Sequence, residues 1–104
     1  MLEKKFRIPS FYFKKIYQKG RVVKGRFVTL RLLENPEAIP RFGIVIRAKT
    51  IKKATKRNLI KRRLTGIIRS RLFKIKPGFD FVFIIKEETS FKELEEDIKR
   101  LLNV

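Results

Sequence analysis

The spacing of apolar residues along the chain predicts a succession of helices and strands. Apolar residues recur at intervals of three and four over residues 11–19, 54–71 and 91–102, which indicates three amphipathic helices. Runs rich in β-branched and aromatic residues over 25–33, 41–47 and 79–86 indicate three strands. The order, αβ(β)βαβα with one further strand left open, predicts an α+β sandwich. The strand-helix-strand unit over residues 42–86 is a candidate parallel crossover.

Local signals place the ends of these helices. Ser10 is expected to cap the first helix and Gly20 to end it. Ser90, with Glu93 three residues later, forms the capping-box pattern that opens the last helix. The residues expected to face the core are Ile60, Leu64, Ile67 and Ile68 in the middle helix and Phe91, Leu94, Ile98, Leu101 and Leu102 in the last one.

Length and composition indicate one folded domain over residues 1–104. The 104 residues are 43% hydrophobic and include ten Phe, which is more apolar surface than disordered chains carry. The longest apolar run, residues 81–85, is far shorter than the roughly 20 residues of a membrane helix. The charged N-terminus is not followed by the apolar stretch of a secretory signal, so a cytoplasmic location is expected.

The chain contains neither Cys nor His. This composition excludes disulfides, zinc fingers, thiol nucleophiles and His-based acid–base catalysis. Any catalysis by the protein would need Lys, Tyr or carboxylates, from which a site that cleaves RNA or DNA is hard to assemble.

Positive charge dominates and is concentrated in the middle of the chain. There are 28 Lys and Arg against 10 Asp and Glu, a net charge of +18. Residues 38–79 hold fourteen basic residues and no acidic one, whereas six of the ten acids lie in the last eighteen residues. Because like charges without counter-ions repel one another, this segment predicts a polyanionic partner. One side of the middle helix gathers Asn58, Lys61, Arg62, Thr65 and Arg69, with Arg57 at its margin.

The aromatic first helix favours RNA over DNA as that partner. Phe13 and Tyr17 are four residues apart and share a helix face, where they either pack in the core or stack on unpaired bases. Asn58 is the only amide of the middle helix, whereas helices that read the DNA major groove use several Asn, Gln or Arg contacts.

Residues 54–64, Ala-Thr-Lys-Arg-Asn-Leu-Ile-Lys-Arg-Arg-Leu, resemble the signature helix of the protein component of bacterial ribonuclease P. That family carries an Arg-Asn-Arg motif followed by an apolar residue and Lys-Arg. Three more segments resemble the family in the same order: residues 13–20 its aromatic first helix, 41–46 the strand before the signature helix, and 77–84 the strand after it. Together the four segments cover nearly the whole chain.

The resemblance implies both a fold and a function. The fold is αβββαβα, a ribosomal-protein-S5-like domain with a left-handed crossover in place of the usual right-handed one. The function is that of an accessory subunit of ribonuclease P, an endoribonuclease that removes the 5′ leader of precursor tRNA. Catalysis belongs to the RNA and to Mg²⁺ held mainly by that RNA. The implied partners are ribonuclease P RNA and precursor tRNA, without DNA or a membrane.

Two groups of residues inherit roles from the family. Those expected to contact the catalytic RNA are Lys53, Lys56, Arg57, Asn58, Lys61, Arg62 and Arg69. Those expected to contact the leader are Phe13, Tyr17 and Leu30.

The chain departs from the family pattern at three positions. Leu59 replaces the third signature Arg, Thr65 stands where another Arg is common, and Leu30 stands where a strand often supplies a third aromatic side chain. We therefore expect two RNA contacts either to be missing or to shift to Arg63 and Arg69, and leader binding to depend more on charge.

Two other classes of function compete with this interpretation. The main alternative is a structural RNA-binding protein of ribosomal type with no role in processing. A cationic membrane-surface peptide fits less well, because it predicts one amphipathic helix rather than several strands and a Phe-rich core.

Overall fold

A computed structural model describes residues 2–103 as three α-helices around a four-stranded sheet. The helices are α1 (Phe13–Lys19), α2 (Ala54–Ser70) and α3 (Phe91–Leu102), and the strands are β1 (Arg21–Lys24), β2 (Val28–Glu34), β3 (Arg41–Val45) and β4 (Phe79–Ile85). Three short 3-10 turns are η1 (Lys4–Phe6), η2 (Ser10–Tyr12) and η3 (Leu72–Lys74). The order of helices and strands is thus αβββαβα, as the resemblance implies.

The sheet has the strand order β1-β2-β4-β3. β2 pairs antiparallel with β1 and β4, whereas β3 pairs parallel with β4. The connection between the two parallel strands contains α2, which confirms the predicted crossover. β3 is an edge strand, and residues just before η2 cover part of that edge through a hydrogen bond from the Ile8 N–H to the Phe42 carbonyl.

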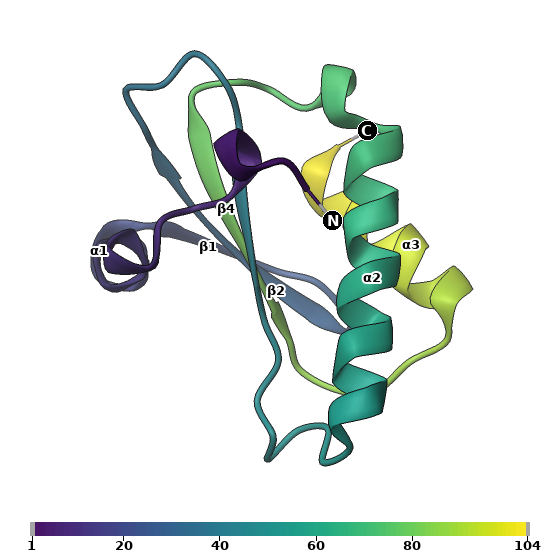
Figure 1. Cartoon of the computed structure of the whole chain (residues 1–104). Helices are drawn as coiled ribbons and strands as arrows, with labels where there is room; N and C mark the ends of the chain where they lie inside the picture. Colours follow the sequence, from purple (N-terminus) through teal and green to yellow (C-terminus); the bar gives the residue numbers. More distant parts are fainter. Residues whose placement is uncertain (1, 104) are drawn as a thin grey trace.

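The two faces of the sheet are covered unequally, with α1 on one side and α2 and α3 on the other (Figure 1). Alternate residues of β2 and β4, among them Leu30 and Phe83, point into the main core beneath α2 and α3. The intervening residues face α1, where Ile16 and Val82 are fully buried in a smaller apolar cluster.

The sequence predicts α2 and α3 closely. Leu64, Ile67 and Ile68 of α2 are buried, and Ile60 packs against them. In α3, the Ser90 hydroxyl accepts the Glu93 N–H at 3.2 Å and so caps the helix as expected. Its predicted core residues Leu94 and Ile98 are buried and Leu101 and Leu102 pack against them.

The prediction that Phe91 faces the core is wrong. Phe91 is the first residue of α3 and its side chain is 42% exposed. Its ring lies against α2 instead, with the Arg63 guanidinium 5.6 Å from the ring centroid.

Two N-terminal predictions are also corrected. The α-helix begins at Phe13 rather than Phe11, because residues 10–12 form a 3-10 turn, and Ser10 makes no capping bond with its side chain. Gly20 directly follows α1, as expected, and donates its N–H to the Ile16 carbonyl.

The strand expected over residues 25–33 begins three residues later, and it is the second strand of a hairpin over residues 21–34 whose first strand was not predicted. β1 ends at Lys24 and β2 begins at Val28. The turn between them is held by Asp97 of α3, whose carboxylate accepts the N–H groups of Arg26, Phe27 and Val28 at 2.9–3.0 Å. Asp97 is completely buried and also accepts a bond from Arg100. An acidic residue some 70 positions away therefore ends β1, and nothing in the local sequence signals it.

A second buried carboxylate fixes the start of α1. Arg41 donates two hydrogen bonds of 2.8 Å to Asp80, and this pairing raises the pKa of Arg41. The same guanidinium lies 4.9 Å from the ring centroid of Tyr12, in the turn that leads into α1. The ion pair therefore anchors the N-terminal side of α1 to the ends of β3 and β4.

No helix within residues 2–103 is long and apolar enough to cross a membrane.

Candidate nucleic-acid interface

The exposed side of α2 carries the cations that the sequence singled out. The apolar stripe of the helix faces the core, which turns Asn58, Lys61, Arg62 and Arg69 to solvent on one long stripe. Lys53, just before the helix, is also exposed.

Few of the cations between residues 38 and 79 have a carboxylate beside them. Within residues 2–103, only three of the fourteen lie within 4 Å of one: Arg41 pairs with Asp80, Lys56 with Glu88 at 3.0 Å, and Arg71 with Glu95 at 3.8 Å. The acidic residues of α3 therefore leave the outer surface of α2 positively charged. A surface of this kind attracts and holds a polyanion.

One member of the predicted RNA-contacting group, Arg57, makes hydrogen bonds within the protein. Its Nη1 donates to the carbonyls of Ile51 and Lys52 at 2.8 and 2.9 Å, and the side chain is half-buried. Arg57 thus holds the loop that leads into α2, and this position places Lys53 next to the exposed cations of the helix.

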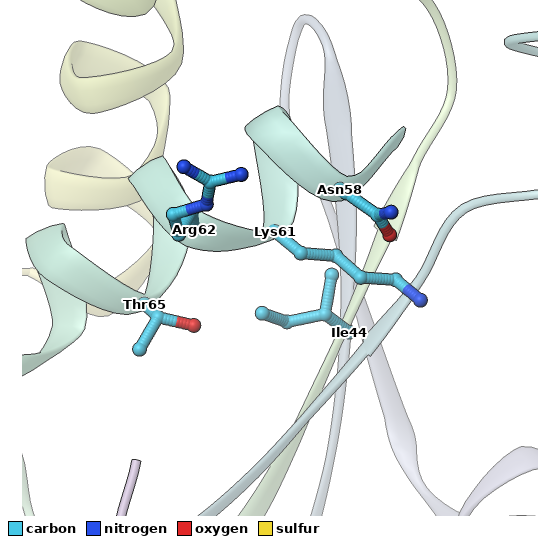
Figure 2. A pocket seen from close by; sticks show the side chains of 5 residues that line it. All are labelled: Ile44, Asn58, Lys61, Arg62 and Thr65. Atoms are coloured by element: carbon cyan, nitrogen blue, oxygen red, sulfur yellow. The ribbon is translucent and has the colours of Figure 1, made fainter. Parts of the chain in front are cut away.

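A pocket of about 400 Å³ lies where α2 passes the edge strand β3. It is lined by Ile44 of β3 and by Asn58, Lys61, Arg62 and Thr65 of α2. Figure 2 shows the aliphatic chain of Lys61 passing over Ile44, with Asn58 and Thr65 on either side. An apolar floor with amide and cationic groups at its rim suits a nucleotide, because the base can lie on the apolar part while its phosphate meets a cation.

A second hollow of about 210 Å³ joins this pocket to α1. It shares Ile44 and Thr65 with the first pocket and is bounded on its other side by Phe13 and Gly43. The missing side chain of Gly43 allows this approach, since a Cβ there would lie 2.5 Å from the Phe13 ring. The two hollows therefore connect the aromatic side of α1 with the cationic side of α2 around the edge strand β3.

The two aromatic residues of α1 are both half-buried. Phe13 packs in the smaller apolar cluster with Ile16 and Val82, and one side of it lines the second hollow. Tyr17 lies against Arg31 of β2, whose guanidinium is 5.1 Å from the ring centroid. Arg31 also donates from Nη1 to the Tyr17 carbonyl at 2.9 Å.

The expectation that Leu30 joins these aromatic residues is wrong. Leu30 is 1% exposed and belongs to the main core, on the opposite side of the sheet from α1. The strand residue that lies against Tyr17 is its neighbour Arg31, because successive side chains of a strand point to opposite faces. The sequence interpretation missed Arg31, although alternation along β2 counted from the buried Val28 would have identified it.

RNA contacts are also expected at Arg69 and Arg63, and neither residue lines the pocket. Arg69 lies near the C-terminal end of the helix, about 16 Å along its axis from Asn58, and is not part of the pocket. Arg63 turns toward Phe91 of α3, away from the pocket.

Comparison with known proteins points to one family. A sequence model of the ribonuclease P family, described as "Ribonuclease P", matches residues 4–104. The ribonuclease P protein component of a Picosynechococcus strain is 38% identical over 93 residues, covering 86% of this chain and 80% of that protein.

Solved structures agree with this comparison. The ribonuclease P protein of Thermotoga maritima superposes with a TM-score of 0.84 at 28% identity, covering 92% of this chain and 94% of that one. A variant of the Staphylococcus aureus ribonuclease P protein superposes with a TM-score of 0.88 at 25% identity, covering 97% of this chain and 88% of that one.

Proposed function

Since the chain belongs to the ribonuclease P protein family, we propose that it binds the catalytic RNA of ribonuclease P and the 5′ leader of precursor tRNA. In this role it assists the RNA in cutting the leader away, and it acts in the cytoplasm. The observation that carries the proposal is the row of cations on α2 that no carboxylate neutralises within residues 2–103.

The catalytic RNA is proposed to lie along the exposed stripe of α2. Lys61, Arg62 and Arg69 would meet phosphates, while Lys53 and Lys56 extend the contact beyond the start of the helix. Lys56 would exchange its exposed pair with Glu88 for a phosphate, and an exposed pair of this kind is worth little to the fold. Arg57 keeps the loop before α2 in place, so its main contribution is to the position of its neighbours.

The leader is proposed to pass from α1 to α2 around the edge of β3. Phe13 and Tyr17 would stack on its unpaired bases, and the Asn58 amide would face a base in the pocket beside Ile44. Arg31 fixes one face of the Tyr17 ring and places a cation beside it. Leader binding in this chain is therefore expected to depend both on stacking of bases on the aromatic rings and on attraction between leader phosphates and Arg31.

Within residues 2–103, no three side chains among Asp, Glu, His and Cys are grouped so that they could hold a metal ion. We propose that Mg²⁺ is held mainly by the RNA, where it would supply the chemistry of phosphodiester hydrolysis. The cations of α2 would neutralise phosphates that otherwise require additional Mg²⁺.

Reconstitution tests the proposal. The purified protein, mixed with a bacterial ribonuclease P RNA transcribed in vitro, is expected to raise the rate of precursor tRNA cleavage at low Mg²⁺. The rate with RNA alone at high Mg²⁺ is the control that the RNA is folded. A structural RNA-binding protein of ribosomal type would leave the rate at low Mg²⁺ unchanged, and that result would reject the proposed function.

Phe13→Ala is expected to weaken precursor tRNA binding to the reconstituted enzyme by about five- to a hundredfold, because a stacked base contributes about 1 to 3 kcal/mol. Arg31→Met is expected to weaken it as well, because it removes the cation beside the Tyr17 ring. Affinity for mature tRNA, which has no leader, is expected to stay the same. Titration of both tRNAs by fluorescence anisotropy measures the difference. Lys24→Met, on exposed β1, is a matched control for the loss of one cation. Equal losses for precursor and mature tRNA would show that these residues act only in folding.

A further inference from the structure

Phe73 is the most exposed of the large apolar side chains in residues 2–103, with 84% of its surface open to solvent. It lies in η3, one turn of 3-10 helix in the connection between α2 and β4. Its ring therefore contributes almost nothing to the core.

Cations flank Phe73 in the sequence, and one of them lies beside its ring in space. Lys74 places its Nζ 5.9 Å from the centroid of the Phe73 ring, and both Arg69 and Lys76 are exposed nearby in the chain. Within residues 69–76, only Arg71 lies near a carboxylate, at 3.8 Å from Glu95. The chain thus presents a flat apolar ring among positive charges that lack counter-ions.

The occupant that this combination fits is an unpaired nucleobase. A base offers a flat face that stacks on the ring, and its phosphates supply the negative charge that Arg69 and Lys74 lack. An apolar protein surface would satisfy the ring but would leave these cations desolvated and unpaired. Phe73 follows the C-terminal end of α2 by three residues, so it lies close in the chain to Arg69, the last cation of the exposed stripe.

We propose that Phe73 is a second anchor for the catalytic RNA, stacking on an unpaired base while Arg69 and Lys74 bind the adjoining phosphates. The inference rests on the proposed function, because it assigns an additional contact to the same RNA. α2 is 17 residues and thus about 25 Å long, so contacts at its two ends fix the direction in which the helix lies on the RNA.

Tryptophan fluorescence tests this contact directly, because the chain has no Trp. Phe73→Trp introduces one indole that stacks on a base in place of the Phe73 ring. Addition of a bacterial ribonuclease P RNA, without any tRNA, is expected to quench its emission. Phe11→Trp is the matched control, since Phe11 is 76% exposed but lies in the turn before α1. Its emission is expected to change little.

Affinity for the same RNA provides the second measurement. Phe73→Ala is expected to weaken binding by about five- to a hundredfold, the range measured for the loss of one stacked base, whereas Phe73→Trp and Phe11→Ala keep the affinity of the unmodified protein. Unchanged affinity of Phe73→Ala, with no quenching of Phe73→Trp, overturns the inference while the proposed function stands. If the unmodified protein does not bind the RNA, the proposed function and this contact both fail.

Discussion

Replacing Lys61 and Arg62 together with alanine is expected to lower affinity for ribonuclease P RNA about a hundredfold or more, because each hydrogen bond to a charged group contributes about 1.5 to 3 kcal/mol. Both side chains are exposed and line the pocket beside β3, so their loss leaves the core intact. The slope of log affinity against log salt is expected to flatten by about 1.8, since each phosphate contact to a duplex contributes about 0.9. Filter binding over a range of salt concentrations gives both quantities.

The matched control removes two cations from the other edge of the sheet. Arg21 and Lys24 are exposed on β1, which is separated from β3 by two strands. Their joint replacement with alanine lowers the net charge by the same amount, and we expect a small change in affinity. A loss as large as that of the α2 variant would mean that the RNA responds to net charge rather than to this helix.

Asp97→Asn is expected to destabilise the protein by about 2 to 4 kcal/mol, although the new side chain has nearly the same shape. The Asp97 carboxylate accepts three backbone N–H groups from the β1–β2 turn and one bond from Arg100. An amide has one oxygen, so its NH₂ group would face a backbone donor inside a fully buried site. Urea unfolding measures the change.

Glu96→Gln is the control for Asp97→Asn. Glu96 is the neighbouring residue on α3 and is exposed, so neutralising it is expected to change the free energy of unfolding by less than about 0.5 kcal/mol. Equal unfolding midpoints for the two variants would contradict the role assigned to Asp97.

The sequence predicts those elements whose stability comes from their own pattern. The apolar stripe of α2 repeats over the whole helix, and the structure differs from the predicted range by one residue. β4 is apolar on both faces and bounded by Pro77 and Gly78, so its start is predicted at the residue where it is found. α3 carries its own capping signal at Ser90.

The predictions that failed depend on contacts between distant parts of the chain. β1 is four residues long, and all but Val23 are exposed, so it buries too little apolar surface to form a strand by itself. It forms because β2 pairs with it and Asp97 holds the turn between them. Phe91 fits the apolar spacing of α3, yet it lies in the first turn, beyond the edge of the core.

The candidate site also has one part that the sequence predicts and another part that it does not. The cations of α2 could be predicted because a helix presents residues at known angles. The pocket could not, because it forms only where Ile44 of β3 comes beside α2. The exchange of Leu30 for Arg31 has a simpler cause: Leu30 is assigned to the leader site only by the family resemblance, whereas alternation along β2 turns Leu30 to the core and Arg31 to the face beside α1.

The salt dependence of binding between the unmodified protein and ribonuclease P RNA tests most directly whether RNA phosphates neutralise α2. Eleven cations between residues 38 and 79 lack a carboxylate within 4 Å in the described part of the chain, which is enough for an extended contact. The predicted slope of log affinity against log salt is about −5 or steeper, corresponding to about six or more phosphates. A slope near −1 would mean that most of these cations touch no phosphate, and it would contradict the account.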